Sequence, residues 1–433
     1  MGFREYIKKI EGKGKLTIIS KPVSKKLEAS AILNELNEKS VLFEKIKESQ
    51  FKVAGNLFGT KDAIADYFGI KPNELIPKII NAIENPSLPE VAEKAPCQEE
   101  EIEVDLDKLP ILFHCEKDGG NYISSGVLIT KDKDGIQNVD FHRCMQIAKN
   151  KFSVRVVKDR HFDQLLKKNK ELPVAVCIGN APNVLIAAAI SVELGRNELE
   201  IANTLEPLKV VKAKTFNGTI PADCEFVLEG IVRLEEKANE GPFVDLTETY
   251  DIVRQEPVFE VKKITHRKDA IWQALLPGKL EHKILMGMPR EPTIFKEVND
   301  AEIKCLDVNV NPGGCSWLHA IVKIDKQKEE DGKKAVEAAF KGHKSCKHIF
   351  IVDKDIDIYN PLEVEWAMAT RFQADTDFIM KPREKGSSLD PSADPETHFT
   401  TKCGFDLTKP LVVKGKNFGK AEFPKVELKK FLE

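Results

Sequence analysis

The sharpest chemical signal in the sequence is a pair of acids that bracket a short turn. Glu240 and Asp245 flank Gly241-Pro242-Phe243, and glycine and proline hold such a turn in a defined shape. Two carboxylates held close together tend to ionise at different pH values, and an arginine between them can decide which one is charged. An acid, an arginine and a second acid could therefore transfer protons. The plain alternative is a surface turn with a weak ion pair.

A second set of polar residues could hold a metal ion. Asn138, His161 and Glu198 offer an amide, an imidazole and a carboxylate, which suit a hard divalent cation that must also hold a phosphate. Arg143 follows Asn138 by five residues. In a regular strand this odd offset directs the two side chains to opposite faces, unless the strand bends between them. Taken alone, each of these residues is more often an ordinary surface or structural group.

The elements that must position these residues begin with a small α/β unit. Residues 1 to about 90 alternate helical patterns, such as Lys25–Leu36, with short strand-like runs, such as Lys15–Ile19. The segment Leu88–Glu103 contains two prolines among several glutamates, which predicts a solvated linker. A first domain is therefore predicted over residues 1–100.

The pattern changes after this segment. From Ile102 to about Ile294 short β-rich runs recur between turns, which predicts a barrel or sandwich with inserted helices. Beyond Lys296 apolar strands alternate with helical stretches as in a second α/β layer, and the last thirty or so residues are expected to form a tail or terminal helix. The second and third domains are predicted over residues 101–297 and 298–433.

Composition excludes several classes of function. The net charge is −3, with acids and bases interspersed, so nucleic-acid binding is not expected. The most apolar stretch, Val184–Ile190, is far shorter than the roughly 20 residues of a membrane span, and Met1–Lys9 lacks a signal-peptide core. The nine cysteines include no Cys-x-x-Cys pair, which argues against a zinc ribbon or a disulfide framework. A cytoplasmic protein is expected.

A series of short segments, taken in order, resembles the UbiD family of decarboxylases over nearly the full length of the chain. The segments are Leu109-Pro110-Ile111, Lys117-Asp118-Gly119-Gly120, Gln137-Asn138 followed by Arg143, His161, Pro221-Ala222-Asp223-Cys224-Glu225, Leu228-Glu229-Gly230, Glu240-Gly241-Pro242-Phe243, Leu275-Leu276-Pro277-Gly278 with Glu281-His282, Pro312-Gly313-Gly314-Cys315, Lys347 with Asp355-Ile356-Asp357, and Lys402-Cys403-Gly404-Phe405-Asp406. Any one could arise by chance, but their order is specific.

This resemblance implies a multidomain α+β and α/β fold. In it a central flavin-reductase-like split β-barrel is flanked by N-terminal and C-terminal α/β domains. It also implies prenylated FMN bound through a divalent metal, usually Mn²⁺, often with K⁺ nearby. The implied metal ligands are Asn138, His161 and Glu198. Because the stretch before Glu198 is shorter than in fungal relatives, Glu193 and Glu200 are alternatives to it.

The same resemblance implies a catalytic network of Glu240, Arg143 and Asp245. The spacing of five residues from Glu240 to Asp245, and from Asn138 to Arg143, matches the family pattern. Arg143 would orient the substrate carboxylate through its planar fork of donors. Glu240 would deliver the proton that replaces carbon dioxide, while the cofactor carries the difficult step. A lysine that meets the cofactor phosphate falls on Lys347, with Lys402 as the alternative.

Three residues near these motifs have no assigned role. Asp140 stands where relatives commonly carry a small residue, and beside a metal and a phosphate it could be an extra ligand or a source of repulsion. Glu281 and His282 lie in a segment that relatives use near the substrate.

The implied function is that of an archaeal-type carboxy-lyase. The leading substrate is trans-anhydromevalonate 5-phosphate, converted to isopentenyl phosphate in a modified mevalonate route of isoprenoid biosynthesis. The alternatives are an aromatic acid of the 4-hydroxybenzoate type and a flavin- or metal-binding protein without catalysis. A phosphorylated substrate would need a basic pocket beyond the flavin, whereas an aromatic one would need an apolar slot. The expected partners are a flavin prenyltransferase and further copies of the chain, in a dimer or hexamer.

Overall fold

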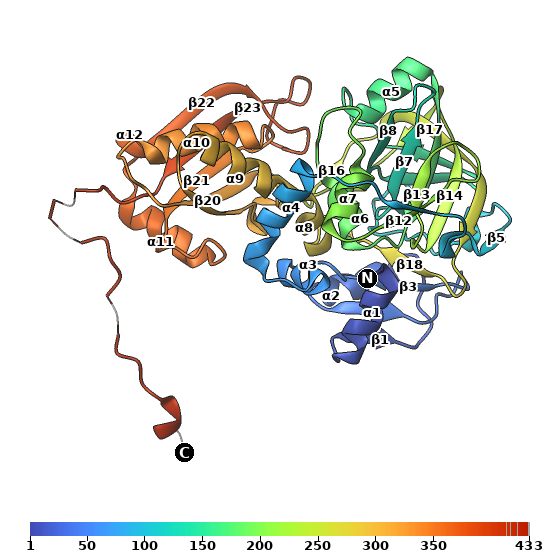
Figure 1. Ribbon diagram of the computed structural model, residues 1–433, viewed down its shortest axis with the longest axis horizontal. Coiled ribbons are helices and arrows are strands. Elements are labelled where there is room, and N and C mark those ends of the chain that lie inside the picture. The colour runs from blue at the N-terminus through green and yellow to red at the C-terminus, as the bar shows by residue number, and fades with distance from the viewer. Residues whose placement is uncertain (413, 416, 422, 432–433) are drawn as a thin grey trace.

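The computed structural model describes residues 1–412, 414–415, 417–421 and 423–431. Three groups of elements follow the chain in Figure 1: a small N-terminal group, a large central sheet on the right and a C-terminal lobe on the left. Helices α4, α8 and α9 lie between the lobes. The mixed α+β, multidomain character expected from the sequence is confirmed.

The N-terminal group is a four-stranded sheet with helices. Its helices are α1 (Phe3–Gly12), α2 (Glu28–Glu35), α3 (Lys61–Phe68) and α4 (Leu75–Glu84). Its strands, in sheet order, are β1 (Leu16–Ile19), β2 (Ser40–Phe43), β3 (Lys52–Gly55) and β18 (Ile271–Ala274). The expected strand near residues 15–19 and the expected helix within residues 25–36 are confirmed. The fourth strand comes from a distant part of the chain and pairs in parallel with β3.

The central region is built on a nine-stranded sheet with the order β6-β9-β10-β17-β14-β11-β7-β8, and β5 pairs with β17. In chain order its strands are β5 (Glu100–Ile102), β6 (Tyr122–Ile123), β7 (Val127–Lys131), β8 (Gln137–Phe141), β9 (Cys144–Ala148), β10 (Lys151–Val154), β11 (Glu171–Ile178), β14 (Phe226–Glu240) and β17 (Arg254–His266). Its helices are α5 (His161–Asn169), α6 (Pro182–Ala189) and α7 (Glu198–Leu205). Within the described residues the edge strands β6 and β8 do not pair, so no closed barrel is found and the split-barrel description is not confirmed.

Smaller sheets complete the central region. One has the order β13-β12-β4, and the other pairs β15 with β16. Their strands are β4 (Glu90–Ala92), β12 (Lys209–Lys212), β13 (Thr219–Pro221), β15 (Phe243–Val244) and β16 (Tyr250–Asp251).

The C-terminal lobe is a five-stranded sheet with helices packed on it. The strands, in sheet order, are β19 (Cys305–Asn309), β20 (His319–Ile324), β21 (His348–Asp353), β23 (Phe399–Asp406) and β22 (Phe378–Lys385). The helices are α8 (Leu280–Gly287), α9 (Glu291–Asp300), α10 (Asp331–Gly342), α11 (Pro361–Arg371) and α12 (Ala374–Asp377), and the 3₁₀ turn η4 (Met288–Arg290) joins α8 to α9. The second α/β layer expected beyond Lys296 is thereby confirmed.

The segment 88–103 is more structured than a solvated linker. Strand β4 pairs with β12 and strand β5 pairs with β17. Cys97 between them is fully buried. The charged composition misled the prediction because edge strands keep their charged side chains in water while their backbone completes a sheet.

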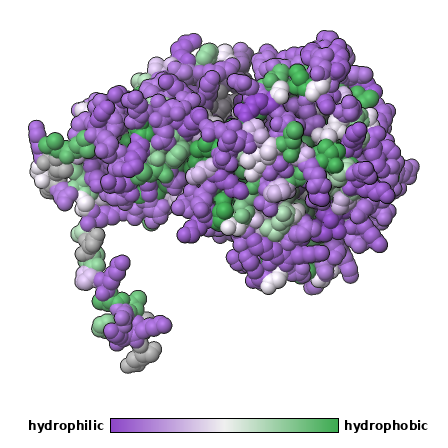
Figure 2. Space-filling model, viewed as in Figure 1, coloured by the Kyte–Doolittle hydropathy of each residue, from purple (hydrophilic) through white to green (hydrophobic). Residues whose placement is uncertain are grey.

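The end of the chain is an extended tail, as expected. It runs away from the C-terminal lobe in Figure 1, and its described residues include one short 3₁₀ turn at Leu428–Lys430. The face shown in Figure 2 is mostly hydrophilic, with scattered apolar spots. Among the described residues, none of the helices combines the length and the apolar character that a membrane crossing requires.

Candidate active site

Arg143 lies at a break in the central sheet. Strand β8 ends at Phe141 and strand β9 begins at Cys144, so the regular alternation of faces stops before the arginine is reached. This break is the bend that the odd spacing from Asn138 required. It lets Asn138 stay in the ladder, opposite Thr130, while Arg143 turns toward the end of β14.

Three carboxylates surround the Arg143 guanidinium. Its Nε and Nη2 donate to the two oxygens of Glu240, each at 2.9 Å. Its Nη1 donates to Asp245 Oδ2 at 2.5 Å, and Nη2 also donates to Asp251 Oδ2 at 2.8 Å. The Glu240 side chain is fully buried, and that of Arg143 is 9% exposed. The structure thus brings the predicted residues 143, 240 and 245 together around one bidentate ion pair.

This arrangement fixes the charge of the arginine. Burial alone would lower the pKa of Arg143, but the hydrogen bonds and charge of Glu240, followed by the charges of Asp245 and Asp251, raise it. The ring of Phe243 lies 4.7 Å from the guanidinium carbon, close enough for a cation–π contact. The group therefore stays charged and held in place at any physiological pH.

The turn that carries Glu240 is held by the Lys117-Asp118-Gly119-Gly120 segment. Glu240 is the last residue of β14, opposite Arg254 in β17, and the Gly241-Pro242 peptide bond is cis. The Gly119 amide donates to the Pro242 carbonyl at 2.8 Å. A Cβ at Gly119 would lie 2.2 Å from the Gly241 oxygen, so only glycine permits this approach.

Two members of the cluster were not found by sequence reasoning. The Tyr122 hydroxyl donates to Glu240 Oε1 at 3.1 Å and accepts from the Gly241 amide at 3.0 Å. Burial, followed by the charge of Glu240, raises the pKa of Tyr122. Asp251 is half-buried, which opposes its ionisation, but Arg254 and Arg143 hold its pKa at about 2. Neither belongs to a motif, although Asp251 follows Asp245 by six residues and could have been weighed as a third acid.

The neighbours Glu281 and His282 face different parts of the molecule. Buried Glu281 accepts from the amides of Leu57 and Phe58 at 3.2 and 3.3 Å, and burial raises its pKa to about 7. His282 Nδ1 accepts from the Gly278 amide at 3.0 Å, which leaves its Nε2 as the protonated nitrogen of the neutral ring. Burial lowers the pKa of His282, while Asp245 opposes this shift and Arg143 adds to it. Only His282 therefore adjoins the arginine cluster.

Asn138 and Glu198 are brought together between β8 and α7. Glu198 Oε2 accepts from the Val139 amide at 3.0 Å, and the Asn138 amide nitrogen is buried without a hydrogen-bond partner. Burial and the charge of Asp140 raise the pKa of Glu198 to about 8. Glu198 is buried, whereas Glu193 is exposed and Glu200 is half-buried.

The Glu198 carboxylate and the side-chain oxygen of Asn138 are ligand types that a hard cation takes. The unpaired atom of Asn138, however, is the donor Nδ2, which needs a hydrogen-bond acceptor and not a cation. His161 is not tied to this pair by any hydrogen bond or ion pair within the described residues. It begins α5, next to Phe162, whose ring lies 4.8 Å from that of His142. His142 Nε2 in turn lies 3.0 Å from Asp140. No cluster of three His, Cys, Asp or Glu side chains suited to a metal is found in the part of the chain that the structure describes.

The two candidate phosphate lysines differ in their partners. Lys347 Nζ lies 2.9 Å from Asp390 Oδ2 and is neutralised by it. Lys402 Nζ donates to the Lys344 carbonyl at 2.5 Å and has no carboxylate within 4.0 Å among the described residues. Burial lowers the pKa of Lys402.

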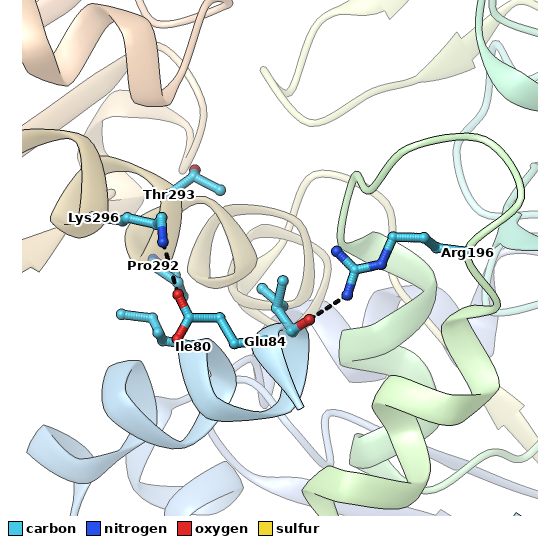
Figure 3. A pocket seen from close by; sticks show the side chains of 7 residues that line it. Ile80, Glu84, Arg196, Pro292, Thr293 and Lys296 are labelled. Atoms are coloured by element: carbon cyan, nitrogen blue, oxygen red, sulfur yellow. Dashed lines mark hydrogen bonds and ion pairs between the residues drawn. The ribbon is translucent and has the colours of Figure 1, made fainter. Parts of the chain in front are cut away.

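A pocket of about 320 Å³ opens elsewhere, between α4 and α9. In Figure 3 Lys296 pairs with Glu84, and Arg196 donates to the backbone of Ile83 across it. Its lining contains none of the residues of the arginine cluster. We therefore place the candidate active site at Arg143 rather than at this pocket.

Comparison with known families matches three successive domains of one enzyme. Residues 7–83 match the 3-octaprenyl-4-hydroxybenzoate carboxy-lyase N-terminal domain of UbiD. Residues 90–280 match the Rift-related domain of that carboxy-lyase, and residues 283–407 match its C-terminal domain.

Two archaeal relatives carry the same name. A protein of Methanosarcina mazei named anhydromevalonate phosphate decarboxylase is 40% identical over 98% of this chain and 100% of its own. A protein of the same name from Methanothermobacter thermautotrophicus is 39% identical, over 91% of this chain and 94% of its own.

Solved structures of the same class share the fold. The UbiD-class enzyme HmfF from Pelotomaculum thermopropionicum, in complex with FMN, superposes with a TM-score of 0.95 at 33% identity over 100% of both chains. An evolved dimeric form of HmfF in complex with prFMN gives a TM-score of 0.91 at 32% identity, again over 100% of both chains.

Proposed function

The chain belongs to the UbiD family of carboxy-lyases, and from this premise we propose that it decarboxylates trans-anhydromevalonate 5-phosphate to isopentenyl phosphate. The name that its archaeal relatives share, anhydromevalonate phosphate decarboxylase, supports this substrate. The observation that carries the proposal is the buried Glu240 carboxyl held by both nitrogens of the Arg143 fork. This contact holds the carboxyl in one place, away from bulk water, where it could take part in proton transfer to a substrate.

We assign the two steps of substrate handling to Arg143 and Glu240. Of the five N–H donors of an arginine, four are used by the carboxylates: one on Nε, one on Nη1 and two on Nη2. The remaining Nη1 donor would orient the substrate carboxylate. After carbon dioxide leaves, Glu240 would give its proton to C2 of the substrate. Asp245, whose side chain is 18% exposed, would pass a proton from solvent to renew it.

Prenylated FMN, when bound, would supply the electron sink that decarboxylation requires. We propose that Asn138, Glu198 and His161 hold a divalent cation, Mn²⁺ in the first instance, that meets the flavin phosphate, with K⁺ close by. The burial of Glu198 and Asn138 next to one another supports this assignment. Lys347 remains the lysine predicted to bind the cofactor phosphate, although it pairs with Asp390 whereas Lys402 is bonded to a neutral carbonyl.

We also keep three broader parts of the interpretation as proposals. The division into domains 1–100, 101–297 and 298–433 and the split-barrel description of the central sheet are two of them. The third is that the enzyme works in the cytoplasm as a homo-oligomer supplied by a flavin prenyltransferase. The dimeric form of a relative supports self-association.

The test is turnover by cofactor-loaded protein. The chain would be produced with a flavin prenyltransferase without oxygen, and carbon dioxide release would be measured with trans-anhydromevalonate 5-phosphate and with 4-hydroxybenzoate. We expect turnover of the phosphorylated acid and a loss of about 100-fold or more in Glu240→Gln, with the flavin retained. Glu236→Gln is the control, because Glu236 is only partly buried, lies on the same strand and pairs with Lys151.

Two outcomes would contradict the proposal. Turnover of the aromatic acid alone would overturn the substrate. A flavin-loaded wild-type protein that releases no carbon dioxide from either acid would favour a binding protein without catalysis.

A further inference from the structure

The Tyr122 hydroxyl ties the Glu240 side chain to the backbone that follows it. It donates to Glu240 Oε1 at 3.1 Å and accepts from the Gly241 amide at 3.0 Å. Because Gly241 is the residue after Glu240, the two bonds close a ring around this side chain. Tyr122 is 1% exposed, so bulk water does not compete for its hydroxyl. The carboxylate is therefore fixed from two sides, by Arg143 and by Tyr122.

The single proton of this hydroxyl has one strong acceptor. Met145 Sδ lies 3.1 Å away and the Pro242 carbonyl 3.4 Å away, but a thioether is a weak acceptor. The Pro242 carbonyl already accepts from the Gly119 amide at 2.8 Å, and a hydrogen bond to an ionised carboxylate is stronger than one to a neutral group. Burial, followed by the charge of Glu240, raises the pKa of Tyr122, so the hydroxyl keeps its proton. The proton therefore belongs to the bond with Glu240 Oε1.

A strand pairing and an aromatic contact hold Tyr122 in this place. Tyr122 lies opposite Met145 in the β6–β9 pairing, and its ring centre is 4.4 Å from that of Phe243. The Phe243 ring also lies 4.7 Å from the guanidinium carbon of Arg143. One aromatic ring thus supports both residues that donate to the Glu240 carboxylate.

The two oxygens of Glu240 differ in the number of donors that they meet. Oε1 accepts from Arg143 Nε at 2.9 Å and from the Tyr122 hydroxyl at 3.1 Å. Among the described residues, Oε2 accepts only from Arg143 Nη2, at 2.9 Å. Each carboxylate oxygen has about two lone-pair sites. Both sites of Oε1 are therefore occupied, and one site of Oε2 is open.

We propose that Tyr122 is a positioning residue that makes Glu240 Oε2 the oxygen that carries the proton for the substrate. A proton on Oε1 would displace one of its two donors, whereas a proton on Oε2 fills the open site. In the transfer the O–H bond at Oε2 breaks, and the electron pair that carbon dioxide leaves behind forms the new C–H bond at C2 of the substrate. The carboxylate that results keeps its donors from Arg143 and Tyr122. The inference rests on the proposed function in one respect, namely that Glu240 delivers this proton.

Turnover by cofactor-loaded Tyr122→Phe tests the positioning role. This change keeps the ring and removes the hydroxyl. We expect kcat for carbon dioxide release from trans-anhydromevalonate 5-phosphate to fall by about 10- to 100-fold, as for a lost hydrogen bond to a charged group. KM should stay within about twofold of wild type, because both contacts of the hydroxyl are within the protein.

Tyr6→Phe is the matched control. Tyr6 in α1 is 2% exposed, and its hydroxyl donates to the Ala63 carbonyl at 3.0 Å. The variant therefore loses one buried tyrosine hydrogen bond that does not involve Glu240. Its kcat and KM should be those of wild type.

A double variant separates positioning from a purely structural role. If Tyr122 acts through Glu240, adding Tyr122→Phe to Glu240→Gln should change the residual kcat by about twofold or less. A tyrosine that only supports the fold would lower kcat by the same factor in both backgrounds. That second pattern would overturn the inference.

Neutron diffraction supplies a measurement that needs neither turnover nor a folded variant. In wild-type crystals exchanged into D₂O, we expect the deuteron of the Tyr122 hydroxyl to point to Glu240 Oε1. In crystals acidified until Glu240 is protonated, its deuteron should lie on Oε2. A hydroxyl deuteron directed to Met145 or Pro242, or a carboxyl deuteron on Oε1, would contradict the inference.

Different results refute the role of Tyr122 and the proposed function. A wild type that releases carbon dioxide, with the same kcat in Tyr122→Phe, would refute the role of Tyr122 and leave the proposed function intact. A wild type that releases none, with both deuterons placed as expected, would refute the proposed function alone.

Discussion

Arg143 and Arg290 are two interior arginines with opposite surroundings. Arg143 is held by Glu240, Asp245 and Asp251, and their charges outweigh burial and raise its pKa. Arg290 has a hydroxyl, a carbonyl and an aromatic ring around it, and burial lowers its pKa to about 10. Among the described residues, Arg143 thus has carboxylate partners, whereas Arg290 is bonded only to neutral groups.

The two kinds of surroundings suit two different roles of a charged side chain. A charge balanced by the chain's own groups keeps its geometry before any ligand arrives, which is what a proton-transfer site needs. A charge left unbalanced costs folding free energy, and a ligand of opposite charge can recover that cost on binding. The variants below should change stability in opposite directions if this interpretation is correct.

The largest effect is expected at the balanced arginine. Arg143→Met leaves the fully buried Glu240 without its partner, and removal of one member of a buried ion pair costs about 3–5 kcal/mol. We therefore expect the free energy of unfolding of the cofactor-free protein to fall by about that amount in urea titrations. Arg233→Met is the control, because Arg233 is partly exposed and pairs with Glu260 at 2.8 Å, so its loss should cost about 1 kcal/mol or less. Equal losses in the two variants would contradict the prediction.

The same contrast between balanced and unbalanced charge applies to carboxylates. Glu240 has Arg143, whereas Glu281 has two backbone amides and a pKa raised by burial to about 7 from its ordinary 4.5. Because the folded-state pKa is the higher one, the contribution of Glu281 to stability is complete below pH 4.5 and is lost as the pH rises toward 7. The loss amounts to about 3 kcal/mol for such a shift.

Glu281→Gln should therefore flatten this part of the pH dependence. Midpoints of thermal unfolding, measured from pH 4.5 to pH 7.5 for cofactor-free wild type and variant, should fall more steeply for wild type. The variant should be the less stable protein at pH 4.5, where it lacks one acceptor for the two amides. Parallel curves would show that Glu281 does not titrate in this range.

Much of the secondary structure could be predicted from the sequence because it follows from local patterns. The patterns that predicted a helix within Lys25–Leu36 and a strand at Lys15–Ile19 correspond to α2 (Glu28–Glu35) and β1 (Leu16–Ile19). The position of β18 could not be predicted, because Ile271–Ala274 pairs with β3 across more than two hundred residues of chain. Local patterns carry no information on such pairing.

The residues of the candidate site that belong to short sequence motifs could be predicted from the sequence. Glu240 and Asp245 stood out by their turn, and the arginine that joins them came from the family resemblance. Tyr122 and Asp251 were missed because their role depends on strands that meet only in the fold, β6 with β9 and β15 with β16. Arg290 was missed for a different reason. A missing counter-charge leaves no pattern in a sequence, and only the structure shows which charges surround an arginine.

The smallest effect, and the most direct test of the contrast, is expected at Arg290. Arg290→Met removes a charge that has no partner, which favours the variant, but it also removes two hydrogen bonds of about 1 kcal/mol each. We therefore expect the free energy of unfolding of the cofactor-free protein to stay within about 1 kcal/mol of wild type, unlike the large loss in Arg143→Met. A loss of several kcal/mol in Arg290→Met would mean that its neutral partners stabilise this arginine as strongly as carboxylates stabilise Arg143. Arg290 would then stabilise the junction between the two lobes through its neutral partners alone.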